Sequence, residues 1–172
     1  PMSQLTQVFF DKILSAEGGY QNQSADKGNY NRCGTNAGTK YGITPNAWQE
    51  YSGQQCPGPE TMKNLTQSQA WDFMSWWGDR WRIWEIYAQD FAELAFNAFY
   101  GNPSAAAKTL QLTLDQRDYA LAPDGIMGSK TLAAVNVETA KDKTGLYNAY
   151  REAWLSYLQS LGNVHYTAGW TN

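Results

Sequence analysis

The chain has 172 residues, of which 42% are hydrophobic and 17% charged, so its composition is that of a globular protein and not of a disordered one. Its 13 basic and 16 acidic residues give a net charge of −3, and no run of Lys and Arg is present, which argues against a nucleic-acid partner. No apolar run approaches the length of a membrane span, and no signal peptide opens the sequence.

The first third of the sequence predicts a helix, an irregular loop and a second helix. Apolar residues recur at helical spacing over residues 3–16, and the glycine pair 18–19 ends that helix because glycine adopts the left-handed conformation without a steric cost. Residues 21–43 are rich in Asn, Gly, Thr and Tyr and have no helical period, which predicts a long loop or a small irregular β-hairpin. Thr44 and Pro45 then predict the start of a short helix.

The rest of the sequence is dominated by helical patterns. Thr66 and Gln69 form a capping box ahead of a Trp-rich helix, which we expect Gly78 to break or bend. Further helices are expected at residues 88–102, 103–114, 130–140 and 145–161. Ser129 is expected to cap the helix that begins at residue 130. The alternation typical of strands is scarce and no internal repeat is present, so the predicted fold class is mostly α.

Two acidic residues near the N-terminus have contrasting surroundings. Glu17 lies at the end of the first helix beside Ala, Gly and Tyr residues, where the helix dipole and the scarcity of charge favour a raised pKa. Asp26 lies in a polar loop beside Lys27, which favours its ionised form. A protonated acid and an ionised base suit the cleavage of a glycosidic bond. The same two residues are also typical of a solvated helix end and an ordinary turn, and both interpretations stay open at this point.

Six motifs spread along the chain occur in a recognisable order. They are AEGGY (residues 16–20), Asp26, TKYGIT (39–44), LQLTLDQRDYALAPDGIMGSKTLAAVN (110–136), YNAYREAWLSYL (147–158) and the closing AGW (168–170). Together they resemble glycoside hydrolase family 108, the bacterial and phage N-acetylmuramidases. The fourth motif resembles the segment of that family that is thought to bind peptidoglycan.

The resemblance implies a lysozyme-like fold and hydrolysis of the β-1,4 bond between N-acetylmuramic acid and N-acetylglucosamine. It places the catalytic acid on Glu17 and, by similarity to phage-type lysozymes, a water-positioning pair on Asp26 and Thr39. It also implies a lysozyme-like catalytic region at residues 1–100 and a helical peptidoglycan-binding region at residues 101–172, packed as one compact unit. No metal or organic cofactor is implied.

The sequence departs from the family pattern after Asp26. The Gly-Gly pair of the family becomes Gly28-Asn29, and an insertion separates this turn from Thr39. The longer loop makes Thr35 a rival for the role of Thr39.

The insertion also introduces Cys33. A disulfide between Cys33 and Cys56 would brace the enlarged loop in an oxidising compartment, and two free thiols would be expected in the cytosol.

Aromatic residues are abundant, with 8 Trp and 11 Tyr. Most are expected in the core. Tyr20 and Tyr41 flank the expected site and are candidates for the walls of a sugar-binding groove, with core packing as the alternative. Asn97 stands where the family tends to have an Asp, and it is a candidate for a hydrogen bond to a substrate acetamido group or to a backbone carbonyl. His165 is the lone histidine and needs no special role.

The sequence therefore predicts a mostly α, lysozyme-like muramidase that acts on peptidoglycan glycan strands in the periplasm or outside the cell. An endolysin, a secretion-associated wall remodeller and an antibacterial effector all fit, so a secretion or immunity partner stays open. One alternative is a lytic transglycosylase, which needs the acid alone and forms an anhydro sugar. The other is a non-catalytic peptidoglycan-binding or secretion-associated protein, in which the altered loop has lost activity.

Overall fold

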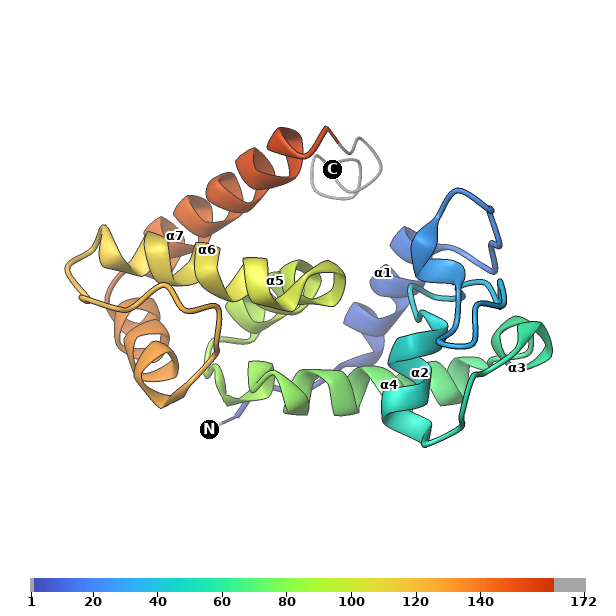
Figure 1. Cartoon of the computed structure of the whole chain (residues 1–172). Coiled ribbons are helices and arrows are strands. Elements are labelled where there is room, and N and C mark those ends of the chain that lie inside the picture. The colour runs from blue at the N-terminus through green and yellow to red at the C-terminus, as the bar shows by residue number, and fades with distance from the viewer. Residues whose placement is uncertain (1, 163–172) are drawn as a thin grey trace. The chain divides into compact units, whose positions relative to one another are not determined.

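A computed structural model describes residues 2–162, which form seven α-helices and two short 3-10 helices (Figure 1). In chain order these elements are α1 (Gln7–Glu17), η1 (Lys27–Asn29), α2 (Pro45–Ser52), α3 (Pro59–Lys63), α4 (Gln67–Arg80), η2 (Ile83–Glu85), α5 (Gln89–Gly101), α6 (Pro103–Asp115) and α7 (Ser129–Ser160). The predicted mostly α, lysozyme-like fold class is confirmed. His165 and the closing AGW lie outside the described residues, and within residues 2–162 no helix is both long and apolar enough to cross a membrane.

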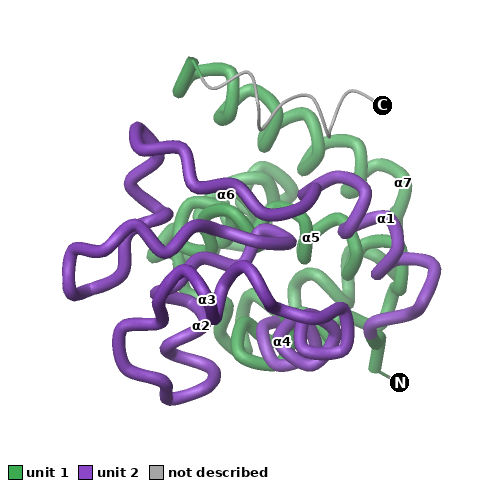
Figure 2. Tube along the Cα trace, turned by 90° about the vertical axis from the view of Figure 1, so that its right-hand side faces the viewer, with its two compact units in different colours: residues 1–4, 78–172 green, residues 5–77 purple. Residues whose placement is uncertain are grey.

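The chain divides into two compact units, which are coloured separately in Figure 2. Unit 2 is Leu5–Trp77, and unit 1 consists of Pro1–Gln4 with Gly78–Asn172. Within unit 1, α5 packs against α6 and α7.

The core of unit 2 is rich in aromatic rings. Phe10 on α1 meets Trp71 on α4 with ring centroids 5.1 Å apart. Phe73 on α4 lies 6.4 Å from Trp48 on α2 and 5.8 Å from Trp77, centroid to centroid. These contacts tie α1 and α2 to α4, and ring pairs of this kind contribute about 0.5–1.5 kcal/mol each beyond their buried area.

The core of unit 1 joins α5, α6 and α7. Phe91 stacks on Tyr150 at a centroid distance of 5.8 Å, and the buried Tyr150 hydroxyl donates a 2.9 Å hydrogen bond to the Ala106 carbonyl. Ser3 brings the N-terminal residues into this unit through a 2.8 Å bond from its backbone N–H to the Trp84 carbonyl. Helix α1 begins at Gln7, and not at residue 3 as the apolar spacing suggested, because the extended Thr6 caps it and accepts a 3.2 Å hydrogen bond from Phe9 N.

Two of the expected caps are confirmed. The Thr44 hydroxyl accepts a hydrogen bond from Ala47 N at 3.2 Å, with Pro45 as the first residue of α2. Thr66 and Gln69 exchange the reciprocal bonds of a capping box, at 2.9 and 3.1 Å.

Two local expectations are wrong. Helix α4 continues through Gly78 to Arg80, and a Cβ at residue 78 would lie 2.0 Å from the Trp84 indole nitrogen, so the glycine serves close packing and not a helix break. Ser129 is the first residue of α7 and not its cap: the capping position is Gly128, and the Ser129 hydroxyl instead accepts a 3.2 Å bond from Arg82.

The helices expected at residues 130–140 and 145–161 are the two parts of α7. Asp142 has non-helical angles (φ −153°, ψ 69°), and Figure 1 shows the change in direction between the orange and the red parts of the helix. The Asp142 carboxylate accepts a 3.1 Å bond from Gly145 N, as an N-cap does for a new helix.

Candidate active site

Glu17 is the last residue of α1, and its position follows from the glycine that comes next. Gly18 adopts φ 71°, which ends the helix, and its N–H donates a 3.0 Å hydrogen bond to the Leu14 carbonyl. Nearby protein atoms desolvate the Glu17 carboxyl and raise its pKa, while the residue keeps an exposed surface. A carboxyl that stays protonated to higher pH and that a ligand can still reach is suited to general-acid catalysis.

Asp26 caps the short helix η1 at the start of the expected loop. Its Oδ1 accepts a 3.0 Å hydrogen bond from Gly28 N, and its Oδ2 accepts a 2.9 Å bond from the Gln21 side-chain amide. Each carboxylate oxygen has two lone pairs, so each keeps acceptor capacity for a further donor such as water. Asp26 is exposed, which leaves that capacity accessible.

Thr39 lies across an antiparallel bridge from Gln21. The two residues exchange backbone hydrogen bonds of 2.9 Å in both directions, and the Thr39 hydroxyl donates a 2.6 Å bond to Asn29 Oδ1. The bridge matches the small irregular hairpin expected here. Thr35, the rival of Thr39, is exposed and pairs through its backbone with Asn31.

The structure therefore brings Asp26 and Thr39 into one hydrogen-bonded network, joined by Gln21 and Asn29. Gln21 follows Glu17 by four residues, so the two Cα atoms are at most about 14 Å apart. The acid and the network thus belong to one short stretch of unit 2.

Gln21 and Asn29 are the residues that sequence reasoning missed. Asn29 is fully buried, although it is a polar residue in a loop. The sequence marked Asn29 only as a departure from the Gly-Gly turn of the family, and Gln21 carried no signal at all. An Asn or Gln in a polar loop is most often solvated, and only the pairing across the bridge sets these two apart.

The two tyrosines beside the site differ in their contacts. Tyr20 donates a 3.0 Å hydrogen bond to the Ala37 carbonyl, and its ring lies so close to Gly38 that a Cβ there would be 2.5 Å from it. Tyr20 thereby fastens the end of α1 to the segment that carries Thr39. Tyr41 is half-buried with φ 55°, and the Lys40 ammonium lies 5.1 Å from its ring centroid. Asn97 is exposed on α5 in unit 1.

The inserted loop is fastened at its far end. Cys33 and Cys56 form a disulfide with Cα atoms 5.9 Å apart. Beside it, the Asn31 side chain donates a 3.0 Å hydrogen bond to the Pro57 carbonyl and accepts bonds from Cys33 N and Thr35 N. The loop between Asn29 and Thr39 is thus tied to the segment that follows α2.

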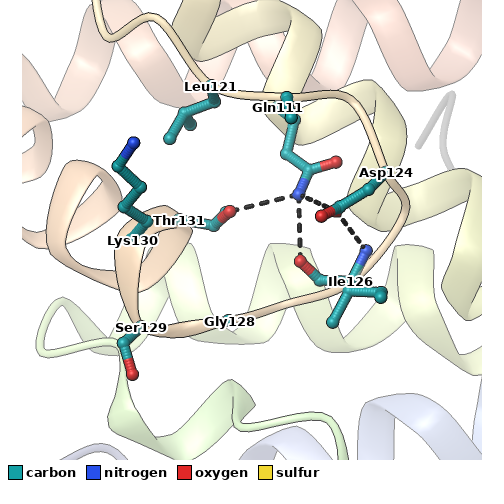
Figure 3. Close-up of a pocket in the computed structure, with 9 residues that line it drawn as sticks. Gln111, Leu121, Asp124, Ile126, Gly128, Ser129, Lys130 and Thr131 are labelled. Carbon is teal, nitrogen blue, oxygen red and sulfur yellow. Dashed lines mark hydrogen bonds between the residues drawn. The ribbon is translucent and has the colours of Figure 1, made fainter.

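Unit 1 contains a separate hollow of about 200 Å³ beside the start of α7. Figure 3 shows the buried Gln111 amide nitrogen, which shares its two hydrogens among three acceptors: the Asp124 carboxylate, the Ile126 carbonyl and the Thr131 hydroxyl, at 2.9, 2.9 and 3.1 Å. Gln111 also accepts a 3.0 Å bond from Gly125 N. The Leu-Gln motif on α6 and the Asp-Gly turn are therefore joined by hydrogen bonds of the Gln111 side chain.

In the part of the chain that the structure describes, no group of three or more His, Cys, Asp and Glu side chains could hold a metal ion.

A helical fold with an acid at a helix end and a second carboxylate in the following loop is the architecture of a lysozyme-like glycoside hydrolase. The chain belongs to the glycosyl hydrolase 108 family, whose family model matches residues 10–102. A second model, described as "Predicted Peptidoglycan domain", matches residues 105–172. The protein is therefore a glycoside hydrolase that acts on peptidoglycan.

One solved structure, that of Brucella abortus SagA, is similar over nearly the whole chain. SagA has 26% sequence identity to this chain, and the two structures superpose with a TM-score of 0.69. The match covers 96% of this chain and 89% of the other. None of the curated proteins matches the chain.

Proposed function

We propose that the protein is an N-acetylmuramidase that hydrolyses the β-1,4 bond between N-acetylmuramic acid and N-acetylglucosamine. The observation that carries this proposal is the presence, in one unit, of Glu17, an accessible carboxyl with a raised pKa, and of the hydrogen-bonded network that holds Asp26 and Thr39 in the loop after α1. Because peptidoglycan lies outside the cytoplasmic membrane, the enzyme acts in the periplasm or outside the cell.

In the proposed reaction, Glu17 donates its proton to the glycosidic oxygen as the C1–O bond breaks. Asp26 and Thr39 hold a water molecule, whose oxygen forms the new bond to C1 and whose proton passes to Asp26. The glycan strand is cleaved with a free reducing end, Glu17 is left ionised and Asp26 protonated. Exchange with solvent restores both groups. Tyr20 and Tyr41 are the proposed substrate contacts of unit 2.

The first test is digestion of purified peptidoglycan by the wild type and by Glu17→Gln, with the products identified by mass spectrometry. We expect reducing-end muropeptides from the wild type and a rate at least about 100-fold lower from the variant, because general-acid catalysis is removed. Glu60→Gln is the matched control: Glu60 is exposed in the same unit, outside the network, and this variant should keep wild-type activity.

Thermal unfolding separates lost chemistry from lost folding. A folded-state pKa raised by desolvation stabilises the protein at low pH, and this stabilisation disappears as the pH rises through the folded-state pKa. Glu17→Gln should therefore melt no lower than the wild type at pH 7. Anhydro products would move the assignment to a lytic transglycosylase. Full activity of Glu17→Gln would remove the acid assignment, and an inactive wild type that still binds peptidoglycan would favour a binding protein.

A further inference from the structure

The Gln21 and Asn29 side chains form a reciprocal amide pair. The Gln21 amide nitrogen donates to Asn29 Oδ1 at 3.1 Å, and the Asn29 amide nitrogen donates to Gln21 Oε1 at 2.8 Å. Their remaining N–H groups reach Asp26 Oδ2 and the Gln23 carbonyl, at 2.9 and 3.0 Å. Their remaining oxygen lone pairs accept from Gln23 N at 3.0 Å and the Thr39 hydroxyl at 2.6 Å. Every hydrogen-bonding position of both amides is thus occupied.

The backbone of Gln23 decides which way each amide faces. A backbone N–H can only donate, so the Gln21 oxygen must face Gln23 N, and the Gln21 nitrogen is turned toward Asp26. A backbone carbonyl can only accept, so the Asn29 nitrogen must face the Gln23 carbonyl, and the Asn29 oxygen is turned toward Thr39. A flipped amide at either position would bring like groups together.

This fixed orientation determines what Asp26 and Thr39 offer to a ligand. The single hydroxyl hydrogen of Thr39 is used on Asn29, so Thr39 offers only lone pairs in any other direction. The Asp26 carboxylate is an acceptor, and the Gln21 amide donates to its Oδ2. The two groups together make a pair of acceptors.

We propose that Gln21 and Asn29 are positioning residues that set the polarity of the water site, holding Asp26 and Thr39 as two hydrogen-bond acceptors. Water bound to two acceptors donates both of its hydrogens and keeps its lone pairs for the anomeric carbon. This inference deepens the proposed muramidase function and rests on it.

The test replaces Gln21 with Glu and, separately, with Met. Gln21→Glu puts an acceptor where a donor faces Asp26, and Gln21→Met removes the donor without adding charge. For both variants we expect kcat to fall about 10- to 100-fold, the effect of losing one hydrogen bond to a charged group, with KM changed less than about threefold.

The dependence of kcat on pH distinguishes a positioning role of Gln21 from a merely structural one, because loss of a structural contact alone would not shift it. Gln21→Glu sets a second carboxylate beside Asp26, which disfavours the ionised base and should move the acidic limb of the kcat profile to higher pH. The alkaline limb, which reports the acid Glu17, should stay where it is in the wild type.

Gln7→Glu is the matched control. Gln7 on α1 donates a 2.8 Å hydrogen bond to the Asp11 carboxylate, so this variant breaks the same kind of Gln–Asp contact with the same charge change, in the same unit and outside the site. It should keep the wild-type kcat and both limbs of the pH profile.

Three outcomes would overturn the inference while the wild type remains an active muramidase. They are a folded Gln21→Glu with wild-type kcat, a loss of kcat with an unmoved acidic limb, and a failure of both Gln21 variants to fold, which would assign the amide pair to loop stability alone. A wild type without reducing-end products would instead remove the proposed function, so the two failures are distinguishable.

Discussion

Glu17 combines rigidity with partial desolvation at a single residue. The left-handed Gly18 stops α1 directly after it, so the carboxyl is carried by the last turn of a helix, near the negative end of the helix dipole. Desolvation by the surrounding protein atoms disfavours the charged form of the carboxyl and raises its pKa. One residue can thereby hold its proton and still remain accessible to a substrate.

Gly38 shows a second constraint at the residue scale, because both its backbone angle and its neighbour exclude a side chain. Gly38 and Gly34 have φ 82° and 85°, but only at Gly38 would a Cβ meet the Tyr20 ring. Gly34→Ala should therefore cost about 1 kcal/mol of unfolding free energy for the left-handed backbone. Gly38→Ala should cost about 1–3 kcal/mol more and lower activity, because Tyr20 must move.

Chemical denaturation of both glycine variants, with activity measured in parallel, checks this prediction. Gly34→Ala serves as the control for backbone strain, since it lies in the same loop with open space around it. Equal stability of the two variants would show that the Tyr20 contact has no energetic weight.

At the scale of the element, the loop after α1 has little regular secondary structure and is stabilised by cross-links at two places. Near the site, the Gln21–Thr39 bridge and the buried Asn29 define its shape. At the far end, the Cys33–Cys56 disulfide closes a loop with a sequence separation of 23 residues. A segment rich in Asn and Gly has little apolar surface to bury, so such cross-links compensate for its backbone entropy.

Replacing both cysteines by serine should lower the free energy of unfolding by about 3 kcal/mol, the loop-closure entropy expected for this separation. The corresponding fall in Tm is about 6–12 °C. Differential scanning calorimetry with and without dithiothreitol measures it: the reductant should lower the Tm of the wild type to that of the double variant and leave the variant unchanged. A wild-type Tm that stays unchanged after complete reduction of the disulfide would contradict this prediction.

At the scale of the whole molecule, carboxyls with shifted pKa values fall on opposite sides of the unit division. In unit 1, hydrogen bonds from Arg117 hold the pKa values of Glu138 and Asp142 below their usual range, with Tyr119 adding a further bond to Glu138. In unit 2, the pKa of Glu17 is raised. Lowered pKa values stabilise the folded state above the usual carboxyl range, and this stabilisation is lost as the pH falls through the lowered values.

Arg117→Gln should therefore lower the Tm at pH 7 by about 4–8 °C, because the variant removes the 2.7 Å ion pair with the buried Glu138 and the 3.1 Å contact with Asp142. The gap to the wild type should narrow as the pH falls below about 4, where the carboxyls become protonated in both proteins. Calorimetry across that pH range is the measurement.

Lys143→Gln is the control for the ion-pair prediction. Lys143 and Asp90 are 3.2 Å apart, but both side chains are about half exposed, so this pair should contribute little and the Tm should stay within about 1 °C. A gap for Arg117→Gln that persists unchanged at pH 2 would show that its effect is not ionic.

Local rules account for the parts of the structure that the sequence predicted well. Gly18 ends α1, and Thr44 and the Thr66–Gln69 pair cap their helices, because each of these contacts involves residues at most four positions apart. The prediction for Gly78 is wrong for the opposite reason. Its role depends on Trp84, which a turn in the chain returns against α4, and spacing within one helix carries no sign of that contact.

By itself the sequence determined the helical class of the protein, its family and the position of Glu17 at a helix end, because periodicity, caps and motifs depend on residues that are close in the sequence. Only the tertiary structure decided that Asp26 and Thr39 share one network, and that Gln21 and Asn29 join them. The direction of an amide depends on what faces it across the fold. The sequence does not show which way the amide of an Asn or Gln faces. In this loop the backbone N–H and carbonyl of Gln23 determine the orientation of both amides.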